Sequence, residues 1–361
     1  MSNAFLLSRV RLQFNQSNPD LLHQLSAIAL SPDGSLWVGS DEFLSLERLS
    51  PLGSNLYGDH QTFHLGDYLE LADSEAEIDI EGLSYSAGYL WVTGSYSAKR
   101  KKPKGKKTGA NAHKDIQRLT KIKQDANRYL LARIPVHEGN LVQSCNKTKD
   151  HPRLTAACLG KSPSQNVLLD CLKQDEHLGP FLKVGLPSKD NGFDIEGLAV
   201  QGQRVLLGLR GPVLGGWAII LELELTEGEP GELCFKEFDK NVFYRKHFVD
   251  LNGLGIRDLF LHQNELFILA GPTMLLPGTL QIFRLRDLLQ HRQDTLWPQA
   301  TSELEWLFDL PYNPGQDNAE GLTLFPCLGY EDSLMVVYDA PDLARCPDGR
   351  SIFTDVFRLP S

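Results

Sequence analysis

The five residues Asp-Ile-Glu-Gly-Leu occur twice in this chain, at residues 79–83 and again at residues 194–198. Residues 318–322 read Asn-Ala-Glu-Gly-Leu, and two weaker relatives are Gly-Ile-Arg-Asp-Leu at 255–259 and Gln-Leu-Ser-Ala-Ile at 24–28. After each copy come a turn and a short apolar run of the kind that forms a buried β-strand. One motif that recurs with strands behind it indicates a repeated structural unit.

The spacing of the copies predicts the fold. Units of roughly 40 to 60 residues with several short strands are typical of propeller blades, so we expect an all-β protein, a single β-propeller domain over residues 1–361. Glu81 and Glu196, at the centres of the first two strong copies, are 115 residues apart. We interpret this gap as one blade with a basic, flexible insertion at 99–127 and a partly helical insertion at 140–177, which predicts five blades. Two blades in the gap would make six, and that alternative stays open.

The ends of the chain are expected to close the propeller. A strand predicted at Val10–Phe14 can pair with the last strands, around Ile352–Leu359. Such pairing removes the open sheet edges that the first and last blades would otherwise expose.

Composition limits the function classes. With 361 residues, 42% hydrophobic residues and a formal net charge of −10, the chain has the balance of a folded, soluble protein. It contains no apolar run of about eighteen residues, which predicts no membrane-spanning helix. Its start lacks a signal-peptide pattern and its six cysteines are scattered, so we expect a cytoplasmic protein with free thiols. Because nucleotide-binding and hydrolase motifs are missing, we predict no nucleotide cofactor and assign no catalytic residue.

A basic run from Lys99 to Lys107 carries seven positive charges. Such runs bind nucleic acid, polyphosphate or anionic lipid, or stand in solvent as mobile loops. The run has no aromatic side chain on which a base can stack, so nucleic acid is not the expected partner. We interpret the run as a solvated insertion.

The motif glutamates are expected to converge, because the first strand of each propeller blade lines the central channel. Converging carboxylates need a counter-charge, from Arg257, a metal ion or protons. Carboxylate and amide oxygens suit calcium or magnesium, and side chains two residues apart on a strand share a face. The predicted metal ligands are Glu81, Glu196, Glu320, Asp79, Asp194 and Asn318. Two other interpretations stay open: the motif ties neighbouring blades together, or it binds an organic ligand.

The predicted ligand-binding residues are Arg210, Arg257 and Asp258. Arg210 comes directly after a buried strand, where a guanidinium group can hold a carboxylate or phosphate. The expected partners are therefore a small anionic ligand or another protein. The other interpretation of Arg210 is an ion pair between blades, with Asp194 or Glu196.

Several motifs, taken in order, resemble a known bacterial family. They are Phe193–Leu198, Gly208–Leu214, Gly253–Leu259, Leu269–Thr273 and Ala319–Leu322. The chain resembles the domain-of-unknown-function family 3616 over nearly its whole length. This resemblance implies a β-propeller-type domain, mostly bacterial, without an established activity.

A more distant resemblance concerns the first strong copy of the motif. Residues 79–83, together with Gly88–Leu90 and Gly94–Ser97, are similar to a segment of the β-propeller phytases. The resemblance implies that Glu81, and by repetition Glu196, binds calcium; the additional acidic D-D-E run of those enzymes is missing here. We therefore expect a ligand- or cation-binding or scaffold module that uses the acidic mouth of the channel. The alternative is a calcium-dependent hydrolase of phosphate esters or similar anionic substrates.

Overall fold

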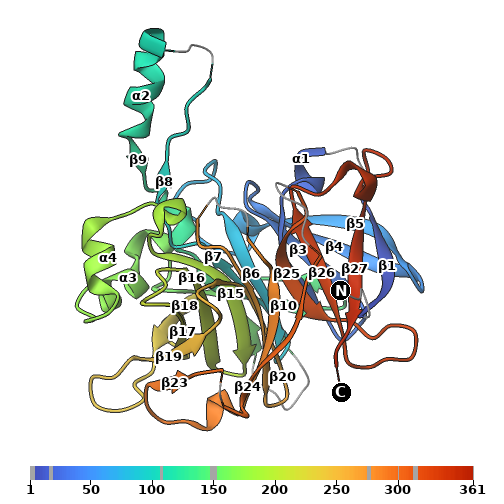
Figure 1. The fold of residues 1–361 in the computed structure, drawn as a ribbon. Helices are drawn as coiled ribbons and strands as arrows, with labels where there is room; N and C mark the ends of the chain where they lie inside the picture. The colour runs from blue at the N-terminus through green and yellow to red at the C-terminus, as the bar shows by residue number, and fades with distance from the viewer. Residues whose placement is uncertain are drawn as a thin grey trace.

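The computed structural model describes residues 5–15, 19–105, 109–146, 153–274, 278–299, 301–311 and 316–360. Its strands form antiparallel blades, each of which begins with an inner strand that carries one copy of the motif (Figure 1). The blades are β2 (Leu25–Leu30), β3 (Leu36–Ser40), β4 (Ser45–Gly53) and β5 (Leu56–His64); β6 (Ile80–Ser86), β7 (Tyr89–Gly94), β10 (Leu131–His137) and β14 (Ala157–Leu159); β15 (Asp194–Gln201), β16 (Arg204–Gly211), β17 (Trp217–Glu227) and β19 (Tyr244–Asp250); β20 (Gly255–His262), β21 (Glu265–Gly271), β22 (Gln281–Arg286) and β24 (Leu304–Asp309); β25 (Asn318–Leu324), β26 (Ser333–Asp339), β27 (Ser351–Arg358) and β1 (Leu6–Gln13).

The inner strands form a ring. They adjoin one another in the cyclic order β2, β6, β15, β20, β25 and back to β2. The apolar core lies between the blades, since each buried cluster draws on two consecutive blades. Trp37 and Trp91, for example, are almost fully buried in two successive clusters. The protein is therefore a β-propeller, as its repeated motif predicts.

The N- and C-terminal strands close the last blade. β1 pairs with β27 in antiparallel fashion, from Leu6 opposite Phe357 to Gln13 opposite Ser351. β1 also runs parallel to β5 of the first blade, so the chain ends join the two blades that meet there. The predicted closure is confirmed.

The remaining elements lie in connections between strands. They are α1 (Pro19–Leu22), α2 (His113–Leu119), α3 (Val167–Leu172), α4 (Gly179–Val184), β8 (Lys99–Arg100), β9 (Ile122–Lys123), β11 (Asn140–Leu141), β12 (Ser144–Asn146), β13 (Arg153–Thr155), β18 (Glu232–Phe235), β23 (Thr295–Trp297) and the 3-10 turns η1 (Leu65–Asp67), η2 (Gly109–Ala112), η3 (Ala126–Tyr129), η4 (Pro163–Gln165), η5 (Ser188–Asp190), η6 (Leu288–Gln290) and η7 (Leu343–Arg345). The helix expected in the second insertion is α3, with Leu168 and Leu172 buried. Over the ranges described, no helix has the length and apolar character needed to cross a membrane.

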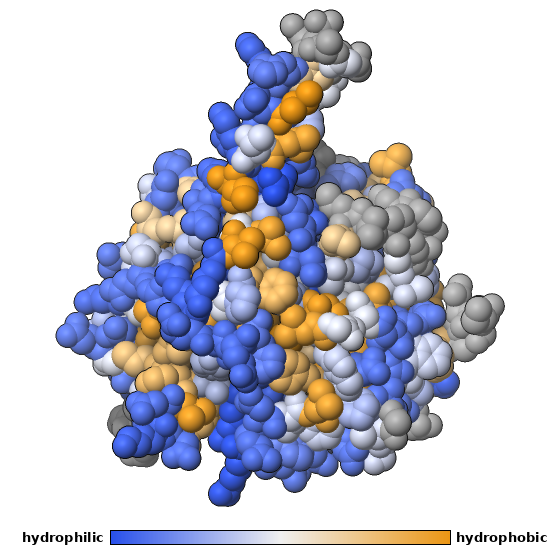
Figure 2. All heavy atoms as spheres, turned by 60° about the vertical axis from the view of Figure 1, so that its left-hand side comes forward, coloured by the Kyte–Doolittle hydropathy of each residue, from blue (hydrophilic) through white to orange (hydrophobic). Residues whose placement is uncertain are grey.

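We call residues 99–123 the basic arm. β8 pairs with β9 at its base, and α2 stands away from the propeller body in Figure 1. Figure 2 shows the arm as a projection on which hydrophilic and apolar residues are mixed. No residue of α2 is buried. Asp115 of α2 accepts hydrogen bonds from the backbone N–H groups of Lys104 and Gly105, at 2.9 and 3.0 Å, and so holds the two sides of the arm together.

The glycine of the motif allows neighbouring inner strands to approach closely. A Cβ atom on Gly197 of β15 would lie 2.8 Å from Cγ and 3.1 Å from the backbone nitrogen of Leu259 on β20. A Cβ atom on Gly82 would likewise come close to Leu198 of β15, and one on Gly321 would come close to Ile28 of β2. The repeated Glu-Gly pair is thus partly a packing requirement, because a side chain there would push the strands apart.

We predict that Gly197→Ala lowers the free energy of unfolding by about 1–3 kcal/mol, as overpacking against a backbone does. Urea unfolding followed by tryptophan fluorescence measures the change. Gly53→Ala is the matched control, because a Cβ atom there would have no neighbour within 4 Å. Equal stability of the two variants would contradict the packing role.

Candidate functional site

Each inner strand has a β-bulge at the third residue of its motif. In β6 the pairing passes from Ile80 to Gly82 while β7 advances by one residue, so Glu81 is the extra residue. The bulged residues of the other inner strands are Ser26, Glu196, Arg257 and Glu320. A bulge re-aims the side chain of its extra residue. The three motif glutamates consequently share the wall of one cavity, as the sequence predicts.

A continuous chain of ion pairs joins the bulged residues of three blades. Arg210, on β16, pairs through Nη2 with Oδ2 of Asp194 at 2.8 Å and through Nη1 with Glu196. The other oxygen of Glu196 lies 3.1 Å from Nε of Arg257, which also pairs with Glu320. The five side chains are at most 14% exposed. The ion pair expected of Arg210 is present, but it lies within one blade; it is Arg257 that links different blades.

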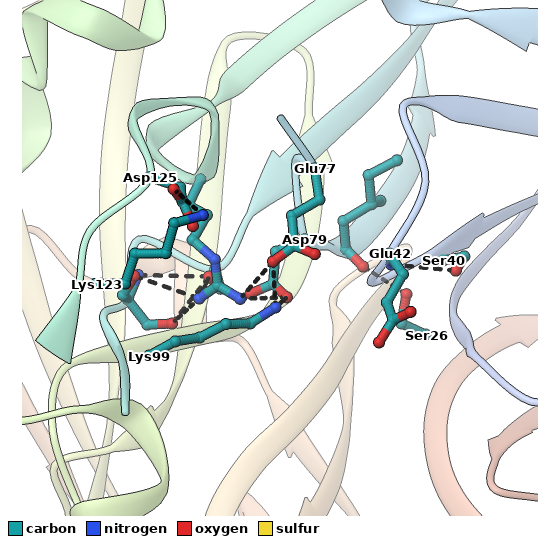
Figure 3. A network of polar contacts seen from close by, with 12 residues as sticks. Ser26, Ser40, Glu42, Glu77, Asp79, Lys99, Lys123 and Asp125 are labelled. Atoms are coloured by element: carbon teal, nitrogen blue, oxygen red, sulfur yellow. Dashed lines mark hydrogen bonds and ion pairs between the residues drawn. The ribbon is translucent and has the colours of Figure 1, made fainter. Parts of the chain in front are cut away.

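A second group of charges surrounds Asp79. Nη2 of Arg128 lies 2.5 Å from Oδ1 of Asp79, and Nζ of Lys99 lies 3.6 Å from the same oxygen. Lys99 also pairs with Glu77 (Figure 3). Arg128, in η3, is 1% exposed and donates from Nη1 to Oγ of Ser97 at 2.7 Å. No sequence pattern indicates Arg128, because one arginine at the edge of an insertion belongs to no repeat.

Glu81 and Asp41 are among the carboxylates of the cavity that have no such partner. Within the part of the chain that the structure describes, the carboxylate of Glu81 makes no hydrogen bond or ion pair, and Oδ1 of Asp41 is buried without a hydrogen-bond partner. Burial, reinforced by the charges of Glu196 and Asp79, raises the pKa of Glu81 well above its ordinary value. Burial beside Asp79 and Asp339 likewise raises the pKa of Asp41 to about 7. Oδ1 of Asp41 is thus a buried acceptor without a partner, and Glu81 is an acid without a cation in contact.

Asp41 and Asp339 also line the cavity, and the sequence contained a signal that would have found both. β3 ends at Ser40, directly before Asp41, and β26 ends at Asp339. Arg210 was singled out because it lies at the end of the second strand of its blade. The same position in two of the other blades is occupied by these two acids.

The cavity has a volume of about 530 Å³ and is lined partly by segments far apart in the chain. Its inner lining consists mainly of the acids and arginines described above, which are buried or half-buried. Its outer lining comes from Lys99–Pro103 at the base of the basic arm and from Pro187–Asp190 around η5, and the exposed residues of these two segments are Lys101, Lys102, Pro103, Lys189 and Asp190. Nη2 of Arg100 lies 2.7 Å from Oδ2 of Asp190 and joins the two segments. The base of the arm therefore forms part of the cavity mouth, which its interpretation as a solvated insertion missed.

Three of the predicted site residues do not line this cavity. Arg257 lies behind Glu196 and Glu320, which it neutralises. Asp258 accepts hydrogen bonds from the backbone N–H groups of Leu259 at 2.8 Å and Leu322 at 2.7 Å, and so ties β20 to β25. Asn318 lies opposite Asp339 in the pairing of β25 with β26.

Four of the six predicted metal ligands are engaged by arginines. Asp79 contacts Arg128, while Asp194, Glu196 and Glu320 contact Arg210 or Arg257 as described above. Among the described residues, no three His, Cys, Asp or Glu side chains are placed to hold a metal ion. The arrangement therefore does not fit a calcium or magnesium ion held by the six residues predicted from the sequence.

We predict that Glu196→Gln lowers the free energy of unfolding by about 3 kcal/mol, because two buried guanidinium groups lose their shared negative partner. Urea unfolding provides the measurement. Glu229→Gln, in an exposed pair with Lys161, is the control and should change stability by less than about 0.5 kcal/mol. A Glu196→Gln variant as stable as this control would show that the network contributes nothing to stability.

Stability should also fall as the pH rises. The pKa values of Glu81 and Asp41 are higher in the folded chain than in the unfolded chain, so the folded state binds more protons between about pH 4 and 7. Their favourable contribution is complete below this range and is lost as the pH rises through it. We expect the melting temperature of the wild type to fall between pH 5 and 8, and that of Glu81→Gln to fall less. Parallel melting profiles for the two proteins would contradict the raised pKa of Glu81.

Comparison with known proteins places the chain in a family. No curated protein matches it. Among solved structures, it is similar to the calcium-binding protein regucalcin from Agrobacterium tumefaciens strain C58, with 10% identity and a TM-score of 0.41 over 98% of this chain and 95% of that one. It is also similar to virginiamycin B lyase from Staphylococcus aureus, with 10% identity and a TM-score of 0.37 over 97% of this chain and 99% of that one. At these sequence identities and TM-scores, the activity of neither protein is assigned to this chain. The family described as "Protein of unknown function (DUF3616)" matches residues 24–355, and the chain therefore belongs to it.

Proposed function

We propose that the protein is a ligand-binding module whose central cavity takes a small polar ligand by a cationic group. The observation that carries this proposal is the contrast within one cavity wall. Glu196 and Asp194 are neutralised by arginine, whereas Glu81 and Asp41 face the same space without a cation in contact. A bound cation would supply the missing partner and return both acids to their ionised form.

The size and the lining of the cavity support a small organic ligand. A volume of about 530 Å³ lies within the range of sites for small molecules. Its wall consists mostly of charged residues, so an apolar ligand would leave buried charges without solvent or partner. An ammonium or guanidinium group can donate several hydrogen bonds to neighbouring carboxylates.

The test is thermal unfolding at pH 8 with organic amines of increasing size, namely ethanolamine, cadaverine, agmatine and glucosamine. At least one should raise the melting temperature of the wild type, because a ligand that binds only the folded state stabilises it. Titration calorimetry should then show at least about tenfold weaker binding to Glu81→Gln, and unchanged binding to the control Glu229→Gln.

Calcium, magnesium, manganese and EDTA form a second arm of the same experiment. A shift with one of these ions alone, reversed by EDTA and lost in Glu81→Gln, would overturn the organic ligand in favour of a metal ion. In that case, turnover of phosphate esters would decide whether the hydrolase predicted as the alternative is correct. No shift with any amine or metal ion would contradict the proposal as a whole.

A further inference from the structure

We infer that the ligand is dipolar, with an anionic group at the end opposite its cationic group, because the cavity mouth presents free lysines above an acidic interior. The inference rests on the proposed function and adds to it the chemical class of the ligand. Lys101 and Lys102 come from the basic arm, and Lys189 comes from η5. All three line the cavity and are exposed to solvent.

The contacts of neighbouring residues show which charges are available. Lys99 is paired with Glu77 and Asp79, and Arg100 is paired with Asp190. The next two residues, Lys101 and Lys102, have no side-chain hydrogen bond or ion pair with any described residue. The same holds for Lys189, although its charge acts on Asp339 at longer range and offsets part of the rise that burial causes in the pKa of that acid. The mouth thus carries three ammonium groups that the protein does not neutralise by contact.

The lysines belong to a mouth whose two sides are held together. Besides its ion pair with Asp190, Arg100 donates from Nη1 to the backbone oxygen of Leu119 at 2.6 Å, which fixes the end of α2 at the base of the arm. Lys99 and Arg100 pair with β9 at Lys123 and Ile122. Segments ninety residues apart in the sequence therefore form one mouth. The strands β8 and β9 at the base of the arm are labelled in Figure 1.

The two charged zones discriminate between classes of ligand. A simple cation that reaches Glu81 must pass the ammonium groups of the mouth, and a simple anion held by those groups faces the acids of the interior. A molecule with its cationic end inward and a carboxylate or phosphate outward satisfies both zones. Amino acids, phosphorylated amines and amino-sugar phosphates have this chemistry and fit a cavity of about 530 Å³.

The charge distribution of the whole chain favours approach of the anionic end at this mouth. Residues 99–123 contain eleven lysines and arginines and one aspartate, a net charge of +10, which leaves −20 for the rest of a chain whose total is −10. An anionic group is repelled by most of the surface and attracted to the arm. The arm thereby acquires a role in binding that its projection into solvent does not suggest.

The experiment compares matched probes that differ only in the anionic group: ethanolamine with phosphoethanolamine, cadaverine with lysine, agmatine with arginine, and glucosamine with glucosamine 6-phosphate. Calorimetry at pH 8 should show, for at least one pair, at least about tenfold tighter binding of the dipolar member to the wild type. In the triple variant Lys101→Gln, Lys102→Gln, Lys189→Gln this preference should vanish, while the affinity for the amine stays or rises.

The matched control is the triple variant Lys104→Gln, Lys114→Gln, Lys121→Gln. It removes the same number of positive charges, all of them from the arm, but changes no residue that lines the cavity, so it should keep the preference. Equal binding within every pair, or equal loss of the preference in the two triple variants, overturns the inference and leaves the proposed function standing. If no member of any pair binds the wild type, the proposed function fails together with the inference.

Discussion

The close approach of the inner strands around the axis is the constraint on which the rest of the structure depends. At Gly82 and Gly197 the next strand lies so near that a Cβ atom would collide with it, and at Gly321 a Cβ atom would be in tight contact with the backbone of the next strand. The residue before each glycine is the extra residue of a bulge, and for three blades that residue is a glutamate that lines the central cavity. Packing and chemistry are thus coupled: the features that bring the blades together also gather carboxylates around one cavity.

Arginines offset most of the electrostatic repulsion between these carboxylates. A guanidinium group can bridge two carboxylates with fixed geometry, as Arg210 does for Asp194 and Glu196, and Arg257 for Glu196 and Glu320. These pairs, together with the backbone contacts of Asp258, correspond to the interpretation of the motif as a tie within and between blades. Glu81 occupies the same position in its own strand but has no arginine in contact, unlike Glu196 and Glu320. The same motif therefore forms stabilising ion pairs in some blades, whereas in the blade of Glu81 its carboxylate has no cation in contact.

The basic arm changes the character of this cavity. Without it, the charges at the axis would be an acidic cluster balanced by buried arginines. With its base at the mouth and Arg100 bound to Asp190, the cavity has an acidic interior and a basic entrance. Charge asymmetry of this kind orients a ligand as well as attracting it, because each end of a dipolar molecule is favoured at only one depth.

The sequence by itself determined the propeller, its closure by the chain ends and the gathering of Glu81, Glu196 and Glu320. Those features depend on local strand patterns and on a repeat, and both can be read along the chain. Only the tertiary structure decided which carboxylates are neutralised, because Arg128, Asp41 and the mouth of the cavity come from different blades and insertions. Repetition made the three glutamates look equivalent and suggested a shared metal ion. Folding makes them different, since each meets the particular neighbours that its blade and the adjoining insertions bring within a few ångströms, and electrostatic interactions depend on those distances and on burial.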